Sequence, residues 1–302
     1  MAVTDRSAST STDTDSGGRA DRRTDGTDED GPGGARRDRG RDLGRRFAED
    51  GFVVVRGLFA AAEIDALCDE FTALHAAGPV PGHFEPRATG AAGPVDPLHV
   101  RPRVMQPHRI NALARRFLLD PRLRGVLEIL LGEEVLAAQS MFYFKPPGAR
   151  GQALHQDNFY LRTEPGTCVA AWVACDVIDR GNGGLEVVPG THRMDVFCPE
   201  EADEGLSFAR EYVPPPPGLA AVPVGMEPGD VLFFNGSLVH GSPPNRSADR
   251  FRRSFIGHYV GRSTRRIGRH YPTLTMGGDP VPLPQSAGAG PCGTEFAPAG
   301  PH

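Results

Sequence analysis

Short apolar stretches separated by glycine- and proline-rich turns recur between residues 134 and 262 of this sequence. They occupy residues 134–148, 166–178, 185–193, 220–224, 230–236 and 252–262. Such lengths and boundaries are typical of β-strands, and 38 glycines with 29 prolines argue against a mainly helical chain. We therefore predict a mainly β (α+β) chain that folds as a double-stranded β-helix, the cupin-type jelly roll.

Helical patterns precede these strands. Residues 41–50 and 60–77 carry such patterns, and in the second of them the apolar side chains recur at helical spacing. A third helix is expected at 121–131, because Asp120 can cap its start and Gly132 can end it. We expect these helices to flank the jelly roll on its outside.

The chain divides into one folded unit and two tails. Residues 1–40 are polar and charged, so we predict a disordered N-terminal tail, followed by a single jelly-roll domain at 41–276. The remainder, 277–302, is rich in glycine and proline and is expected to be irregular. A long loop at 78–103 is a candidate substrate lid, and 195–218 is expected to be a loop or insertion.

Charge and cysteine content exclude several classes of protein. A formal net charge of −5 is too mild to indicate binding to nucleic acid or to a membrane surface. No apolar run approaches the roughly 18 residues of a membrane span, and we expect a cytoplasmic protein. The odd number of cysteines and the absence of C-x-x-C spacing predict free thiols. The cysteines are Cys68, Cys168, Cys175, Cys198 and Cys292.

His155 and Asp157 stand two residues apart in the sequence QALHQDNFY. If this segment is a strand, both side chains point to the same face. One further histidine would complete the two-histidine, one-carboxylate set that holds iron(II) in non-haem oxygenases. The candidates are His192, His240, His258 and His270. We favour His240, because it ends an apolar strand and is followed by a glycine, and such strand mouths are where barrels place binding sites.

An iron(II) oxygenase that uses 2-oxoglutarate also needs a cation for the distal carboxylate of this co-substrate. A planar guanidinium suits that task, and Arg246, Arg250, Arg252 and Arg253 all follow His240. Adjacent residues of a strand face opposite sides, so only one of the last two can point inward. Lys145 is the single lysine among 33 basic residues, which indicates a position where arginine would not serve.

Taken together, these segments resemble the phytanoyl-CoA dioxygenase family of iron(II)/2-oxoglutarate-dependent oxygenases. The resemblance covers roughly residues 45–262. It rests on GFVVVRGLF near the start, HQD at 155–157, Trp172, NGGLEVVPGTHR, and HGSPPNRS followed by Arg-Arg-Ser.

This resemblance implies a role for each matching residue. Its iron ligands fall on His155, Asp157 and His240. Its 2-oxoglutarate contacts fall on Arg252, Lys145, Trp172 and Ser242. The spacing between the second histidine and the arginine is one residue longer than is common, so Arg253 stays an alternative to Arg252.

The implied cofactors are Fe(II), 2-oxoglutarate and O2, with succinate and CO2 as co-products. Hydroxylation of an unactivated C–H bond is the default outcome, and the carboxylate of Asp157 predicts no halogenation. Desaturation, epimerisation or oxidative cyclisation would use the same site and stay open. The arginine-rich composition suggests natural-product tailoring by association only. Two alternative functions from other classes of protein are a zinc-dependent hydrolase and a non-catalytic cupin-like binding protein.

Overall fold

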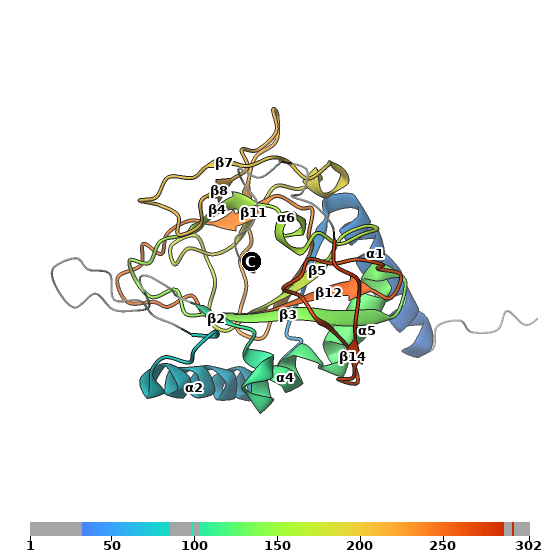
Figure 1. Cartoon of the computed structure of the whole chain (residues 1–302), viewed down its shortest axis with the longest axis horizontal. Coiled ribbons are helices and arrows are strands. Elements are labelled where there is room, and N and C mark those ends of the chain that lie inside the picture. The colour runs from blue at the N-terminus through green and yellow to red at the C-terminus, as the bar shows by residue number, and fades with distance from the viewer. Residues whose placement is uncertain (1–31, 85–97, 99–102, 287–291, 293–302) are drawn as a thin grey trace, which may run out of the picture.

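Two antiparallel sheets face each other in the computed structural model, which describes residues 32–84, 98, 103–286 and 292 (Figure 1). The larger sheet has the strand order β1 (Phe52–Val55), β10 (Val231–Asn235), β5 (Val169–Ala174), β12 (Ser254–Gly261), β3 (Val135–Tyr143), β13 (Thr273–Thr275) and β14 (Pro280–Val281). Strand β2 (Arg103–Met105) also pairs with β3. The predicted jelly-roll architecture is confirmed.

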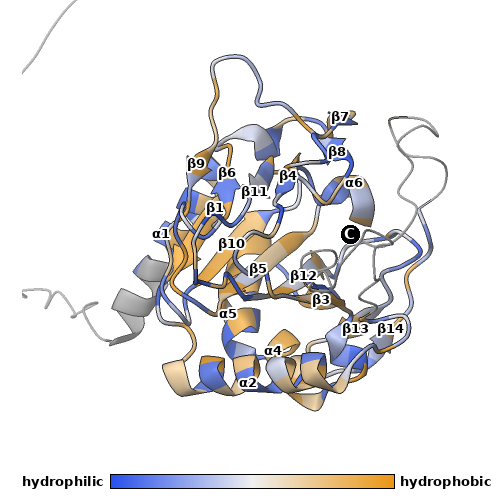
Figure 2. Ribbon diagram, turned by 90° about the vertical axis from the view of Figure 1, so that its left-hand side faces the viewer, coloured by the Kyte–Doolittle hydropathy of each residue, from blue (hydrophilic) through white to orange (hydrophobic). Residues whose placement is uncertain are grey.

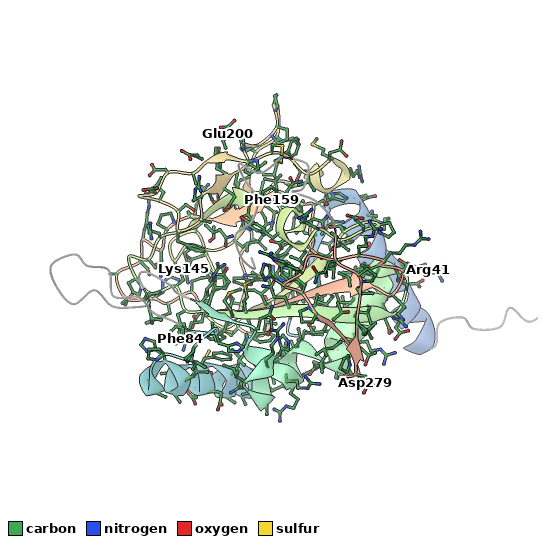
Figure 3. The ribbon with its side chains drawn as sticks, in the orientation of Figure 1. Arg41, Phe84, Lys145, Phe159, Glu200 and Asp279 are labelled. Carbon is green, nitrogen blue, oxygen red and sulfur yellow. A yellow bond between two sulfur atoms is a disulfide. The ribbon has the colours of Figure 1, made fainter. Side chains whose placement is uncertain are left out.

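The smaller sheet covers one face of the larger one. Its strands are, in order, β4 (Gln152–His155), β11 (His240–Ser242), β6 (Glu186–Val187) and β9 (Val222–Pro223). A separate two-stranded ribbon, β7 (Glu200–Glu201) with β8 (Glu211–Tyr212), lies beyond it in the segment that we predicted to be a loop or insertion. Figure 3 shows side chains filling the space between the sheets, with Glu200 on the outer ribbon.

Helices cover the opposite face of the larger sheet. They are α2 (Ala61–Ala77), α4 (Ala112–Leu118) and α5 (Pro121–Leu131), while α1 (Pro32–Asp50) lies beside β1 and α5. Shorter helical segments are η1 (Pro107–Arg109), α6 (Asn158–Leu161) and η2 (Thr191–Arg193). The caps expected for α5 are present, since the Asp120 side chain accepts from the Arg122 amide and Gly132 is left-handed.

Strand alternation divides the interior into two apolar layers. On β5, Val173 packs in the layer beneath the helices, whereas Trp172 packs in the layer between the two sheets. Figure 2 shows the most hydrophobic ribbon on the central strands of the larger sheet and mixed polarity on the helices. The layer between the sheets is therefore where an inward-facing polar group is shielded from water.

Several predicted boundaries were wrong. The first helix begins at Pro32 instead of Arg41, and α4 was not predicted at all because its seven residues are too few for a clear periodicity. Part of the tail expected at 277–302 joins the sheet, since β14 pairs with β13. Most of the loop at 78–103, the candidate lid, lies outside the described residues.

The prediction of five free thiols was also wrong. Cys198 and Cys292 form a disulfide across 94 residues of sequence, with Cα atoms 5.3 Å apart. The fold brings the two cysteines together, and no local spacing motif could have predicted the disulfide. Cys68, Cys168 and Cys175 are free and buried. No helix among the described residues is long and apolar enough to cross a membrane.

Candidate active site

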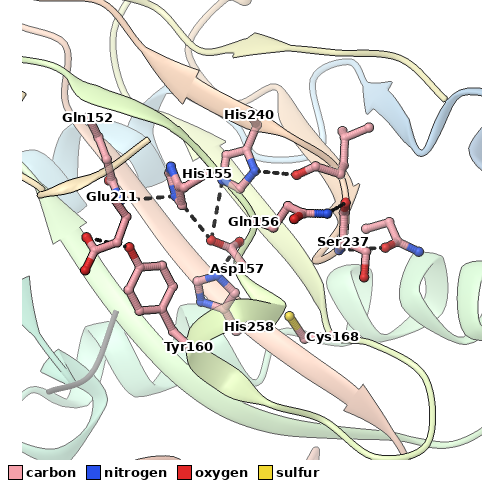
Figure 4. Close-up of polar contacts among 12 residues, drawn as sticks. Gln152, His155, Gln156, Asp157, Tyr160, Cys168, Glu211, Ser237, His240 and His258 are labelled. Carbon is pink, nitrogen blue, oxygen red and sulfur yellow. Dashed lines mark hydrogen bonds and ion pairs between the residues drawn. The ribbon is translucent and has the colours of Figure 1, made fainter. Parts of the chain in front are cut away.

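His155, Asp157 and His240 converge between the two sheets. Their potential ligand atoms all lie within 4.8 Å of one another, and no other such group occurs among the described residues. The Oδ1 atom of Asp157 is 3.5 Å from Nε2 of His155 and 3.4 Å from Nε2 of His240 (Figure 4). The sequence-predicted triad is thus assembled in one place.

The two histidines meet because their strands pair. His240 stands opposite His155 in the β11–β4 register, and their ring centroids are 4.4 Å apart. Gly241 allows this approach, because a Cβ there would lie only 2.8 Å from the carbonyl oxygen of Gln152. A glycine after the second histidine is therefore a packing requirement of the site.

Asp157 reaches the same point by a different route from the one predicted. Strand β4 ends at His155, and the backbone of Asp157 is already helical, with φ −62° and ψ −34°. The expectation of an i, i+2 pair on one strand was therefore wrong. Between the two ligands, the Gln156 side chain bonds to the Ser237 carbonyl and the Phe197 amide, which fixes the turn into α6.

Both histidines present the nitrogen that a metal requires. Nδ1 of His155 is 2.8 Å from the Ala153 carbonyl oxygen, and Nδ1 of His240 is 2.9 Å from that of Leu238. Because a carbonyl can only accept, Nδ1 carries a hydrogen in each ring, so in the neutral form Nε2 is the nitrogen whose lone pair is available to a metal. Burial, followed by the neighbouring His240, lowers the pKa of His155, which favours the neutral ligand form.

Two imidazole nitrogens and one carboxylate oxygen, all from buried residues, match the donor set of a non-haem iron(II) site. Such a set can hold the metal on one side and leave its other positions open. The residues present therefore fit the metal that the sequence predicted.

Arg252 lies in the same cavity as this triad. The walls of this cavity include Tyr143, Trp172, Ser242 and Arg252. The guanidinium of Arg252 is only 3% exposed and lies over the Trp172 ring. Burial lowers the pKa of Arg252 to about 10, so the side chain remains a cation at neutral pH.

Arg253 points away from this cavity. It forms an ion pair with Asp176 at 2.7 Å and is absent from the cavity wall. The two adjacent arginines thus face opposite sides, although both lie just before β12, which begins at Ser254. Of the two candidates, Arg252 is the one placed beside the triad.

Lys145 is placed behind Ser242, at one side of the layer between the sheets (Figure 3). Its ammonium donates to the Gly183 carbonyl at 2.9 Å, to the Ser242 hydroxyl at 2.9 Å and to the Pro243 carbonyl. These bonds use all three of its N–H groups. Burial, with Arg252 nearby, holds its pKa well below the ordinary value. Direct contact of Lys145 with a co-substrate stays a prediction.

The NGG sequence at 182–184 supports this network. Gly183 has φ +71°, and a Cβ there would lie 2.8 Å from Nζ of Lys145 and 2.6 Å from the Pro243 carbonyl oxygen. Arg252 also donates to the Gly183 carbonyl, at 3.2 Å. Asn182 bonds to the Phe251 carbonyl, directly before Arg252, at 3.1 Å. The motif therefore lets two cations share one carbonyl.

His258 is the site residue that sequence reasoning did not assign. The sequence made it only one of four candidates for the third metal ligand, but its Nε2 lies 2.9 Å from Oδ2 of Asp157 (Figure 4). One feature of the sequence could have indicated this role. His258 stands two residues after Ile256 on β12, so both side chains face the cavity between the sheets.

Other histidines have separate partners. His192 donates from Nε2 to the Ala48 carbonyl near the end of α1, at 3.2 Å, and is therefore a capping residue. His270 accepts from Arg269. His83 and His108 bond to the Met105 carbonyl and the Ser140 hydroxyl. His99 lies outside the described residues.

The sequence pattern of phytanoyl-CoA dioxygenase (PhyH) matches residues 47–254. The chain belongs to the phytanoyl-CoA dioxygenase family. The enzyme class predicted from the sequence, a non-haem iron and 2-oxoglutarate-dependent dioxygenase, is the class of this family. The peroxisomal phytanoyl-CoA dioxygenase of Bos taurus is 27% identical over 234 residues. That alignment covers 71% of this chain and 66% of the bovine protein.

Other members and solved structures agree with this assignment. A probable phytanoyl-CoA dioxygenase of Caenorhabditis elegans is 34% identical over 155 residues, covering 46% of this chain and 48% of its own. The structure of EctD from S. alaskensis with 2-oxoglutarate and 5-hydroxyectoine is 26% identical, with a TM-score of 0.57, and covers 74% and 77% of the two chains.

The epimerase SnoN shares the fold. Its structure in complex with Fe3+, alpha ketoglutarate and nogalamycin RO has a TM-score of 0.61 at 22% identity. The match covers 83% of this chain and 96% of SnoN.

Replacing His240 with alanine should abolish Fe(II) binding, because it removes one of three convergent donors. The matched change His192→Ala removes a histidine that caps α1 and should leave Fe(II) affinity unchanged. Anaerobic titration with Fe(II), followed by equilibrium dialysis, measures both. Wild-type affinity in His240→Ala would refute the ligand assignment.

Proposed function

We propose that this chain is an iron(II)/2-oxoglutarate-dependent dioxygenase that oxidises, by default hydroxylates, an unactivated C–H bond of a small molecule. The observation that carries the proposal is the presence of the metal triad and the Arg252 guanidinium in one buried cavity. With iron and 2-oxoglutarate bound, O2 supplies the oxidation, and succinate and CO2 are the co-products.

His155, Asp157 and His240 would hold the metal through Nε2, Oδ1 and Nε2. Their burial keeps water from competing for the carboxylate, and the backbone bonds to both Nδ1 atoms keep the imidazoles in the ligating tautomer. Because Asp157 supplies a carboxylate as the third ligand, we expect hydroxylation instead of chlorination.

Arg252 and Ser242 would bind the distal carboxylate of 2-oxoglutarate. The guanidinium offers paired donors, which match a carboxylate. The Ser242 oxygen receives N–H groups from Lys145 at 2.9 Å and Arg252 at 3.5 Å, so its own hydrogen is left to donate. Since Ser242 lines the cavity, that hydrogen can meet the co-substrate.

Lys145 acts in this proposal by holding Ser242 in place and by adding positive charge behind it. Trp172 would form the wall beside the carboxylate, since its ring already packs under the Arg252 guanidinium at 5.5 Å. Met141, Leu185 and Phe234 complete an apolar lining that excludes water from the reaction.

The substrate would approach past the β7–β8 ribbon. A second hollow shares Gln152 and Ser242 with the metal cavity, and Ala202, Leu206 and Tyr212 of the 195–218 segment contribute to its wall. This position would bring the insertion into contact with the substrate. A role in natural-product tailoring stays a prediction.

Mixing the protein with Fe(II) and 2-oxoglutarate without oxygen should give a weak charge-transfer band at about 500 nm, as expected for a chelated iron(II) of this class. Admitting O2 should then release succinate, and a metabolite screen scored by succinate would find the substrate. A zinc-dependent hydrolase would show neither signal. Absence of both the band and succinate would refute the proposed function.

Changing Arg252 to alanine should raise the KM for 2-oxoglutarate by about tenfold to a hundredfold, because a charged hydrogen-bond donor is lost. Arg253→Ala is the matched control, since Arg253 pairs with Asp176 outside the cavity. Succinate formation as a function of 2-oxoglutarate concentration measures both variants. If only Arg253→Ala raised KM, the co-substrate would be assigned to the wrong arginine.

A further inference from the structure

The two carboxylate oxygens of Asp157 have different surroundings. Oδ1 faces Nε2 of both His155 and His240, at 3.5 and 3.4 Å. Oδ2 faces Nε2 of His258 at 2.9 Å. The carboxylate therefore presents one oxygen to the metal position and directs the other to a third histidine (Figure 4).

His258 itself lies outside the ligand group. The three residues whose ligand atoms gather within 4.8 Å of one another are His155, Asp157 and His240. An ionised carboxylate can only accept, so Nε2 of His258 carries the hydrogen of this bond. A protonated nitrogen cannot coordinate a metal at the same time. His258 acts through Asp157.

The strand that carries His258 is well placed to hold it still. Strand β12 pairs with β3 on one side and β5 on the other, and His258 stands opposite Gln139 and Ala170. Its side chain and that of Asp157 are each 1% exposed. Asp157 lies on the chain that leaves β4, so the hydrogen bond joins the larger sheet to the smaller one across 101 residues of sequence.

Without such a partner, the Asp157 carboxylate could turn. Rotation about the last torsion of an aspartate is broad and roughly two-fold, so either oxygen, or both, could face the metal position. A carboxylate that chelated through both oxygens would occupy one of the positions that a two-histidine, one-carboxylate site leaves open for co-substrate. A fixed Oδ2 keeps the ligand to a single oxygen.

We propose that His258 is a positioning residue that fixes Asp157 as a single-oxygen ligand. The inference rests on the proposed function of this site, and it concerns the orientation of the carboxylate. It also explains why a buried histidine that is not one of the three ligands lies beside Asp157.

The test compares two substitutions of His258 by Fe(II) affinity and by the visible spectrum of the Co(II)-substituted protein. His258→Met removes the N–H donor and should weaken Fe(II) binding by about 10–100-fold, the usual cost of losing a partner of a metal ligand. It should also change the Co(II) spectrum, because the carboxylate is free to chelate. His258→Gln keeps a side-chain N–H and should recover most of the affinity and the original spectrum.

His108→Met is the matched control. His108 is similarly buried, at 5% exposure, but bonds to Ser140 away from the metal position. The His108→Met substitution should lower the melting temperature of the metal-free protein but should leave the Fe(II) affinity and the Co(II) spectrum unchanged. If His258→Met does not fold, His258→Leu takes its place as the variant without a donor.

Wild-type affinity and spectrum in His258→Met would overturn the inference, as would equal losses in the Met and Gln variants. Complete loss of Fe(II) in both would make His258 a ligand and overturn it as well. Failure of the wild-type protein to bind Fe(II) would instead overturn the proposed function. The two failures are therefore distinguishable.

Discussion

The pairing of β11 with β4 places two imidazoles opposite each other, and the rest of the site depends on it. His240 and His155 face one another only because both strands belong to the smaller sheet and because Gly241 lets the backbones approach closely. Asp157 then needs only a two-residue turn out of β4 to reach them. One register in one sheet thus determines where a metal can bind.

The far end of the cavity depends on a second constraint, the burial of two basic side chains to which the described residues offer hydrogen bonds but no ion pair. Lys145 and Arg252 are both nearly inaccessible, and both donate to the Gly183 carbonyl and the Ser242 hydroxyl. Burial of charge is costly unless hydrogen bonds compensate it. An incoming carboxylate would relieve that cost, which is why this end of the cavity suits a dicarboxylate co-substrate.

Much of the fold and of the candidate metal site could be predicted from the sequence. Strand alternation and Gly/Pro turns indicated the jelly roll, and the adjacent Arg252 and Arg253 do face opposite sides. Contacts between distant segments could not be predicted. The Cys198–Cys292 disulfide and the His258–Asp157 bond join residues 94 and 101 positions apart, and neither has a local pattern. The single lysine was singled out correctly as unusual, but its three backbone and hydroxyl acceptors could only be seen in the folded chain.

Anomalous diffraction at the iron edge, from crystals grown without oxygen in Fe(II) and 2-oxoglutarate, tests the central claim most directly. The predicted result is one iron bound by Nε2 of His155, Nε2 of His240 and a single oxygen of Asp157, with the distal carboxylate of 2-oxoglutarate on Arg252. Iron bound by His258, iron chelated by both oxygens of Asp157, or a co-substrate held by Arg253 would contradict it.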